Sequence, residues 1–361
     1  MIGDSPLCDS PYIRSYIEVL EQNNIPFDLL FWNRHLDNTE LLPENYIPFS
    51  YYTDNNYPSW KRLYNIRKFA RFANRWMCKK DYAFVVVFTI AHAIFMSRTL
   101  QKNFKNKYIF DIRDYSPLCN VGFFRGIVKR IIDNAAFTVI SSAGFLRWLP
   151  KSGTRYVVAH NTTESMVNSY LDIGINRIMQ PVETEVKVLT IGQISYYDSQ
   201  VCFVNHLANR EEVSLSFVGA GPASEPLKKY VQESGIRNVS FSGRYEKKDE
   251  ISIAETFHMI NIWLKHSLNA DSCMANRFYL AAQLRKPMIV TKGSHQGELC
   301  EKYGLGVVID EHDDFVEKII KWWQSFDAEI YENGCKAFLK SVENDFKAFN
   351  QSILRLTYNT I

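Results

Sequence analysis

The sequence predicts an α/β fold built from parallel, doubly wound sheets. Apolar runs without alternation, such as residues 82–88 (YAFVVVF) and 107–112 (KYIFDI), are typical of strands that are buried on both faces. Segments with helical periodicity separate these runs, and strands that alternate with helices favour a parallel sheet. Further strands are predicted at 27–32, 136–141, 155–159, 186–191, 215–218, 239–241, 259–264 and 288–290.

The chain length of 361 residues predicts two domains. Residues 173–186 are predicted to link the two domains. We therefore expect a first Rossmann-like domain at 1–183 and a second at 184–335. A last helical segment at 336–361 could run back to the first domain.

Composition restricts the class of protein. The start of the chain has no basic leader followed by an apolar stretch, so we expect no signal peptide. No apolar run reaches the roughly 20 residues that a membrane-spanning helix needs. The seven cysteines have no paired spacing, which favours buried thiols in a reducing compartment over disulfides or a metal site. The expected location is the cytoplasm.

The two halves differ in charge. Residues 1–183 hold 22 Lys and Arg against 16 Asp and Glu, whereas residues 184–361 hold 20 against 23. A basic first half predicts an anionic partner, either a nucleic acid or a membrane surface. Nucleic acid is disfavoured because the basic residues gather on one helix rather than along a groove.

That helix is predicted at residues 60–80. One broad face is apolar, and the remainder carries basic residues without an acidic one. A helix that packs on the core with a solvated charged face explains the pattern, and so does contact with a membrane surface. The residues expected to contact the membrane are Arg67, Arg71, Arg75 and Trp76. Residues 121–132 (VGFFRGIVKRII) are a weaker second case.

The beginning of the chain is irregular. Gly3, Asp4 and Ser5 look like the loop after a first strand, yet only two residues precede them. The first strand of the sheet is therefore missing or supplied in an irregular way. Residues 38–58 are rich in Asn, Pro and Tyr and read as a long loop.

Several polar residues of the first half follow predicted strands. Asp114 and Arg113 could act at the ligand-binding edge, but Asp114 could equally cap a turn and Arg113 could pair with a neighbouring carboxylate. His92 fits a core histidine or a catalytic one. Asn161, after the strand at 155–159, could hold a turn or contact a ligand.

The second half contains glycines directly after strands. Gly192 ends one strand, and Gly219 and Gly221 follow another, where they allow close approach of backbone or ligand. The GxG lacks the full dinucleotide fingerprint, so it is a weak NAD signal. Residues 272–299 then read as a helix, a buried strand and a glycine-bearing loop at the start of another helix.

The order of these motifs resembles the GT-B glycosyltransferases, specifically glycosyltransferase family 4. The similarity covers most of the chain and is best over residues 186–310, in LSFVGAGPASEPLKKYVQESGIRNVSFSGRY and MANRFYLAAQLRKPMIVTKGSHQGEL. FDIRDYSP is similar to the family's cleft loop. The resemblance implies two Rossmann-like domains that face a cleft.

The resemblance also implies a function. The second domain would bind a nucleotide sugar, and backbone N–H groups at the helix start in residues 293–297 would meet its diphosphate. Arg244 or Arg277 would offset charge on the leaving diphosphate. The implied donor-binding residues are Gly192, Gly219, Gly221, Arg244, Asn276, Arg277, Tyr279, Ser294, His295, Gln296 and Gly297. The implied acceptor-binding residues are Gly3, Asp4, Ser5 and Asn161, and the catalytic candidates are Asp114, Arg113 and His92.

The sequence departs from the family in the donor segment. The family typically has two glutamates eight positions apart, of which the second binds the nucleotide ribose, and here these positions hold Ser272 and Leu280. The usual arginine and lysine after the first strand of the second domain are also not evident. Asp271, Asn276 and Tyr279 could compensate.

Three functions follow from these patterns. The first is a retaining glycosyltransferase that needs no metal or other cofactor and extends a glycan or a polyprenyl-diphosphate-linked acceptor in bacterial surface polysaccharide synthesis, such as capsule, O-antigen or exopolysaccharide. It would lie peripherally on the inner face of the cell membrane. The alternatives are a non-catalytic GT-B scaffold with a degraded donor site and a nucleotide-sugar epimerase of the same fold.

Overall fold

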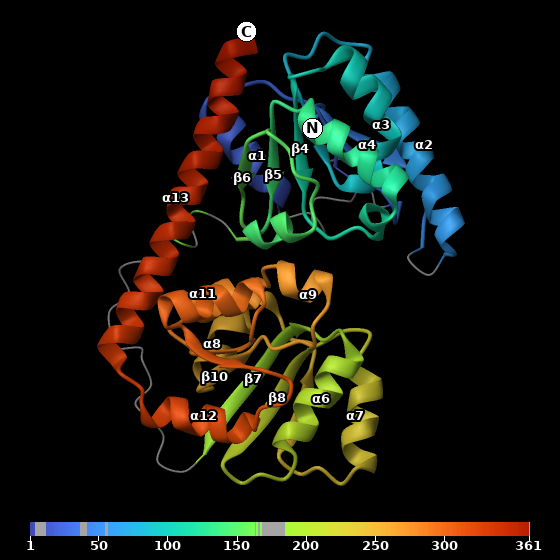
Figure 1. The fold of residues 1–361 in the computed structure, drawn as a ribbon. Helices are drawn as coiled ribbons and strands as arrows, with labels where there is room; N and C mark the ends of the chain where they lie inside the picture. The colour runs from blue at the N-terminus through green and yellow to red at the C-terminus, as the bar shows by residue number, and fades with distance from the viewer. Residues whose placement is uncertain are drawn as a thin grey trace. The chain divides into compact units, whose positions relative to one another are not determined.

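The computed structural model describes residues 1–3, 12–36, 42–54, 57–162, 164, 167 and 185–360. The chain forms two compact units (Figure 1). Unit 1 comprises Met1–Asn161 and Asn344–Ile361, and unit 2 comprises Thr162–Glu343. The expected boundary at 183/184 falls within residues 168–184, which lie outside the described ranges, so it stays a prediction.

Unit 1 is built on a parallel sheet. Its strands are β1 (Leu29–Asn33), β2 (Tyr46–Ser50), β3 (Val85–Phe88), β4 (Tyr108–Ile112), β5 (Phe137–Ile140) and β6 (Tyr156–Val158). β1 pairs with β2, and β3 to β6 pair in sequence order. These runs contain many β-branched and aromatic residues that pack well on a pleated surface.

Ile2 joins the two parts of this sheet. It forms parallel bridges to Leu30 of β1 and to Val87 of β3. Its amide donates to Val86 O at 2.9 Å, and Leu30 N donates to Met1 O at 2.9 Å. The first strand is therefore present as a very short one, and the winding direction changes between Ile2 and β3.

The prediction of a loop over residues 38–58 is wrong for Tyr46–Ser50. These residues form β2, which pairs with β1 in register from Leu29–Tyr46 to Asn33–Ser50. β2 is the edge strand, where Pro48 is tolerated because its missing N–H faces no further strand. The Asn, Pro and Tyr residues around these five residues are typical of loops, so the short strand was not predicted from the sequence.

Helices cover both faces of the sheet in unit 1 (Figure 1). On one face lie α1 (Tyr12–Gln22) and the end of α13 (Ala328–Thr360), which packs Phe349, Ile353 and Leu356 against β3 to β6. On the other face lie α2 (Ser59–Met77), α3 (Ile90–Asn103) and α4 (Gly122–Asp133). The short 3₁₀ helices η2 (Pro117–Asn120) and η3 (Ala143–Arg147) follow β4 and β5.

Unit 2 has a six-stranded parallel sheet in the order β12-β11-β10-β7-β8-β9. The strands are β7 (Val186–Gln193), β8 (Val213–Ala220), β9 (Val239–Gly243), β10 (Met259–Asn261), β11 (Met288–Thr291) and β12 (Gly306–Ile309). The winding reverses between β7 and β10, the place where doubly wound sheets bind ligands at the carboxyl ends of their strands. Both units are Rossmann-like, as the sequence predicted.

The helices of unit 2 also lie on two faces. α6 (Tyr197–Leu207), α7 (Ser224–Glu233) and α12 (Phe315–Gln324) share one apolar core with the sheet. The remaining helices are α8 (Glu250–Glu255), α9 (Leu268–Ser272), α10 (Asn276–Gln283) and α11 (His295–Tyr303). The first part of α13 packs on α10 and α11, where Phe338 contacts the rings of Phe278, Tyr279 and Tyr303.

A buried ion pair ties α13 to unit 2. Arg285 Nε lies 2.8 Å from Glu332 Oε2, and both side chains are almost fully buried. The guanidinium also donates to the carbonyl oxygens of Ala282 and Gln283. Breaking such a pair is costly because one charge would remain buried and uncompensated. Across the described ranges, no helix is long and apolar enough to cross a bilayer.

Candidate functional site

The candidate site of unit 2 lies at the carboxyl ends of β7, β8, β10 and β11. Close backbone approach shapes this edge: a Cβ on Gly219 would lie 1.9 Å from Gly192 O, and one on Gly221 would lie 2.2 Å from Ile194 O. Gly219 has φ +140°, which also excludes most side chains. The three predicted glycines are therefore brought together, and their first role is to pack strand ends.

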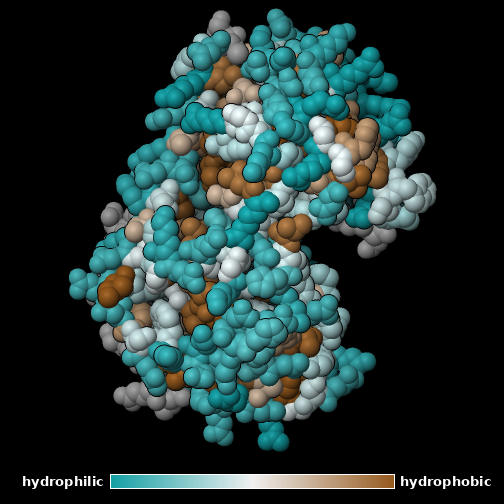
Figure 2. All heavy atoms as spheres, in the orientation of Figure 1, coloured by the Kyte–Doolittle hydropathy of each residue, from teal (hydrophilic) through white to brown (hydrophobic). Residues whose placement is uncertain are grey.

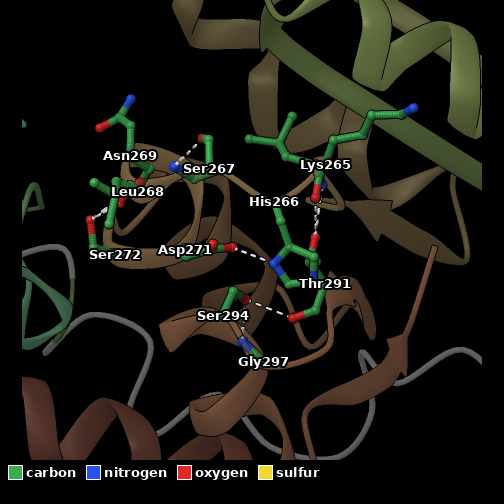
Figure 3. Close-up of polar contacts among 12 residues, drawn as sticks. Lys265, His266, Ser267, Leu268, Asn269, Asp271, Ser272, Thr291, Ser294 and Gly297 are labelled. Carbon is green, nitrogen blue, oxygen red and sulfur yellow. Dashed lines mark hydrogen bonds and ion pairs between the residues drawn. The ribbon is translucent and has the colours of Figure 1, made fainter. Parts of the chain in front are cut away.

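The segment after β10 supplies polar side chains to this edge (Figure 3). His266 Nδ1 lies 2.8 Å from Asp271 Oδ1, and the His266 ring lies against Gly293. Lys265 Nζ pairs with Glu311 Oε1 at 2.8 Å. Thr291 Oγ1 accepts from Leu264 N and donates to Leu264 O, which fixes this segment on β11.

The start of α11 is capped by its own side chain. Ser294 Oγ accepts from Gly297 N at 2.9 Å and donates to Thr291 O at 2.7 Å (Figure 3). A Cβ on Gly297 would lie 2.3 Å from Thr291 O, so only glycine fits there. Gln296 Oε1 accepts from Ala275 N, which joins α11 to the start of α10. Half-buried His295 lies 3.6 Å from Glu298.

Arg277 is a cation without an acidic partner in the described part of the chain. Its guanidinium is half-buried, and Nη1 lies 3.4 Å from Asn261 O at the end of β10. Burial lowers the pKa of Arg277, and the groups that oppose this shift are Cys273, Tyr196 and Tyr245 rather than carboxylates. The guanidinium nevertheless stays protonated at neutral pH. A bound anion would compensate this charge.

Arg244 lies farther along the same edge. Its side chain is exposed, and it borders a cavity of about 350 Å³ with Gly243, Tyr245 and Phe257. Tyr245 OH donates to Glu250 Oε1 at 2.7 Å. The exposed position of Arg244 suits a group at the rim of a ligand site. Half-buried Arg277 is better placed to contact an anion bound inside the site.

The two positions that depart from the family are buried. Ser272 is 1 % exposed and donates to Leu268 O, and Leu280 is 7 % exposed in the apolar core. Tyr279, expected as a substitute ligand, is also buried, and its ring stacks on Phe338 at 6.1 Å. Asn276 is exposed, and half-buried Asp271 pairs with His266.

In unit 1, the assignment of Arg113 to catalysis needs correction. Its Nε and Nη2 each lie 2.6 Å from the carboxylate of Asp111, and Nη1 donates to Ala159 O at 2.9 Å. Tyr16 OH donates to the same carboxylate at 2.6 Å. Arg113 is 4 % exposed, so the bidentate pair neutralises its charge at the end of β4, and the bond to Ala159 O ties it to the residue after β6. The alternative of a neighbouring carboxylate is confirmed.

The other residues predicted for unit 1 are divided between core and surface. His92 is 2 % exposed, contacts Thr89 Oγ1 at 2.7 Å and packs edge-on against Trp32 and Phe69, which is the environment of a core histidine. Asp114 is exposed, Asn161 is half-buried, and Gly3 is buried with its amide on Leu30 O. Asp4 and Ser5 lie outside the described residues.

The basic helix α2 presents the predicted cations outward. Arg67, Arg71 and Arg75 are exposed, and none is in an ion pair with a described residue. Trp76 instead turns partly inward, where it lines a cavity of about 640 Å³ between the amino-terminal ends of β1 and β3. The exposed apolar groups of α2 are Trp60, Leu63 and Tyr64. Figure 2 shows hydrophobic surface on the side of unit 1 where α2, α3 and α4 lie.

Sequence reasoning missed Lys265, His266 and Tyr196. The first two follow the predicted strand at 259–264, and the signal that could have found them was the change from apolar to polar residues at that strand end. Tyr196 precedes α6 with φ 58°, and its hydroxyl accepts from Asn269 Nδ2 at 2.8 Å. Only the folded sheet places it beside Arg277.

No protein-family model matches the sequence, and no curated protein matches it. Solved structures do match. Sucrose-phosphate synthase from Thermosynechococcus elongatus is 13 % identical with a TM-score of 0.71, over 99 % of this chain and 95 % of that chain. The lipopolysaccharide outer core galactosyltransferase WaaB in its apo form is 15 % identical with a TM-score of 0.67, over 98 % of both chains.

A third similar structure contains ligands. Anabaena HepE in complex with UDP and glucose is 14 % identical with a TM-score of 0.61, over 100 % of this chain and 99 % of that chain. At this level of identity the likeness establishes the fold. The chain has the GT-B fold with two Rossmann-like units, which confirms the architecture predicted from the sequence.

Proposed function

We propose that this protein is a glycosyltransferase that takes a sugar from a nucleotide-sugar donor and transfers it to a glycan or polyprenyl-diphosphate-linked acceptor. The observation that carries the proposal is Arg277, a half-buried cation without an acidic partner in the described chain, at the carboxyl end of β10. A charge in this environment is costly unless an anion meets it. The diphosphate of a nucleotide sugar is such an anion.

The surrounding groups suit donor binding. Arg277 would offset the charge that grows on the leaving diphosphate, and the amides at the start of α11 would add hydrogen bonds. Because Gly297 N already binds Ser294 Oγ, the amides of His295 and Gln296 are the ones proposed to face the ligand. The GT-B structures that resemble this chain include one named as a complex with UDP-glucose, which supports the choice of donor.

The finer setting follows the sequence resemblance. We propose that transfer retains the anomeric configuration, needs no metal, and serves bacterial surface polysaccharide synthesis on the inner face of the cell membrane. Exposed Arg67, Arg71 and Arg75 support this location, because anionic lipids and polyprenyl diphosphates attract cations. The acceptor is assigned to unit 1, with Gly3, Asp4, Ser5 and Asn161 as its proposed contacts and Asp114 as a proposed catalytic residue.

Titration calorimetry with UDP, GDP and other nucleoside diphosphates tests the donor site. We expect one nucleotide to bind, and Arg277→Gln to raise its Kd by roughly tenfold to a hundredfold, since a hydrogen bond to a charged group contributes about 1.5–3 kcal/mol. Arg237→Gln removes an exposed cation elsewhere on unit 2 and should leave Kd unchanged. Absence of any nucleotide binding would overturn the proposal.

A non-catalytic scaffold is the second candidate, because Ser272 and Leu280 replace the two glutamates of the resembled family, and Leu280 offers no carboxylate where that family binds ribose. Incubation with the nucleotide sugar that binds best separates the candidates. A transferase consumes it in the presence of a lipid-linked acceptor, a scaffold leaves it intact, and an epimerase converts it without acceptor. The exposed basic face of α2 disfavours the epimerase, which has no use for a membrane.

A further inference from the structure

Unit 1 contains a second cavity, of about 380 Å³, at the carboxyl end of β1. It lies between β1, the first half of α2 and η2. Trp32 and Arg34 come from β1 and the residue after it, Arg62, Leu63 and Ile66 from α2, and Leu118 from η2. Of the predicted acceptor-binding residues that the structure describes, neither Gly3 nor Asn161 lines this cavity.

Among the described residues that line it, the cavity has two guanidinium groups and one carboxylate. Arg34 lies over the Trp32 ring, with its Cζ 4.9 Å from the centroid, and Arg62 Nη2 lies 3.2 Å from Ser59 Oγ. Asp54 also borders the cavity. α2 begins here without a side-chain cap and without an acidic residue in its first turn, so the helix dipole adds positive potential. The fork of N–H donors on a guanidinium group matches the geometry of phosphate oxygens.

The remaining wall is apolar. Leu63, Ile66 and Leu118 line it, and Leu63 continues onto the outer face of α2, where it is 38 % exposed. Trp60 and Tyr64, which are 71 % and 51 % exposed, lie beside it on the same helix. A ligand with a charged head and an apolar chain would satisfy both parts, since the head would meet the arginines and the chain would cover exposed apolar surface.

We propose that this cavity binds the phosphorylated head of a lipid-linked acceptor, with the apolar chain lying along Leu63 and Trp60. The inference rests on the proposed transferase function and deepens it, because it assigns the acceptor class to a defined place in unit 1. Arg34 and Arg62 bind the phosphate oxygens. Leu63 contacts the apolar chain, so the site binds a lipid diphosphate more tightly than free diphosphate.

Binding of a soluble ten-carbon isoprenyl diphosphate to the full chain tests this site, with inorganic pyrophosphate as the second probe. We expect the isoprenyl diphosphate to bind more tightly than pyrophosphate. Combined Arg34→Gln and Arg62→Gln should raise both Kd values at least tenfold. Combined Arg98→Gln and Lys102→Gln, which remove two exposed cations of α3, should change neither.

The variant Leu63→Ser distinguishes binding of a lipid diphosphate from binding of free pyrophosphate. It should weaken the isoprenyl diphosphate severalfold and leave pyrophosphate unchanged. Equal affinity for both probes, or no effect of the arginine pair, overturns the inference. Nucleotide titration of each variant keeps this result distinct from donor binding: unchanged nucleotide affinity also shows that the variant is folded. Isoprenyl diphosphate binding without any nucleotide binding would reject the transferase and keep the lipid site.

Discussion

Gly219 shows how a single position limits the edge of unit 2 where the candidate site lies. Its φ of +140° belongs to a region that side chains rarely adopt, and a Cβ would lie 1.9 Å from Gly192 O. The clash is with backbone, which cannot rotate away as a flexible side chain could. The glycines near the ends of β7 and β8 therefore hold two strand ends close together before any ligand is considered.

Gly219→Ala should destabilise unit 2 by at least about 2 kcal/mol, because both the conformation and the space exclude a methyl group. Thermal unfolding followed by circular dichroism should show a lower Tm. Gly126→Ala on α4 is the matched control: no atom lies within 4 Å of its added Cβ, and alanine favours a helix over glycine by roughly 0.5–1 kcal/mol. An unchanged Tm for Gly219→Ala would contradict the packing argument.

Arg113 and Arg277 show that the same residue type can have opposite roles at two strand ends. Arg113 is neutralised by Asp111 and packed between strands, so its charge serves the fold. Arg277 instead lies 3.4 Å from the carbonyl oxygen of Asn261, and Tyr196 and Tyr245 act on its pKa only as weak electrostatic neighbours. Both were candidates from the sequence, and only the position of a carboxylate distinguishes them.

At the scale of elements, α2 combines a packing face with a charged one. Phe69, Ala70 and Ala73 are buried against the sheet, and Phe69 stacks on Trp32 at 5.7 Å. This confirms that the helix packs on the core. The opposite side carries exposed cations and exposed Trp60 and Tyr64, and contact of this side with a membrane stays a prediction.

Changing Arg67, Arg71 and Arg75 together to Ser should weaken binding to anionic vesicles. Each cation near an anionic surface contributes about 1 kcal/mol, so the apparent Kd for phosphatidylserine vesicles should rise roughly a hundredfold. Sedimentation with vesicles measures this effect, which should diminish as salt increases.

Three exposed cations of unit 2 provide the control for that experiment. Lys228→Ser, Arg237→Ser and Lys248→Ser together remove the same charge from the other unit. Net charge alone would make the two triple variants equal, and that outcome would reject α2 as the membrane-binding element.

At the scale of the whole molecule, buried histidine links stability to pH. His258 is 5 % exposed, and its Nδ1 accepts from Lys187 N at 2.8 Å, so the folded state needs the neutral ring. Burial, with the nearby Lys286 and Lys187, lowers the pKa of His258 below its usual 6.5. Below about pH 6.5 the unfolded chain therefore binds a proton that the folded chain does not, and stability falls as pH decreases.

His258→Asn keeps an acceptor for Lys187 N and removes the titration. Urea unfolding at pH 7.5 and 5.5, followed by tryptophan fluorescence, should show a smaller loss of unfolding free energy in this variant than in the native protein. His312→Asn changes an exposed histidine and should behave as the native protein does. Equal losses in all three proteins would rule out His258 as a source of the pH dependence.

The sequence by itself determined the order of strands and helices and the presence of two Rossmann-like units. Strands of a buried parallel sheet are nearly all apolar, so the continuous apolar runs at residues 82–88 and 107–112 can be recognised as strands from the sequence. The sequence did not predict β2, because this edge strand is short, half-exposed and contains a proline. Ile2 escaped because one residue carries no periodicity, although it bridges two strands.

Only the tertiary structure decided which candidate side chains can meet a ligand. Whether Arg113 is paired, His92 is enclosed or Tyr279 is stacked depends on neighbours distant in the chain, such as Ala159, Trp32 and Phe338. The same holds for Arg277 and for the cavity of Arg34 and Arg62. A residue's type fixes the charge that it can carry, whereas packing fixes the groups that surround that charge and hence its role.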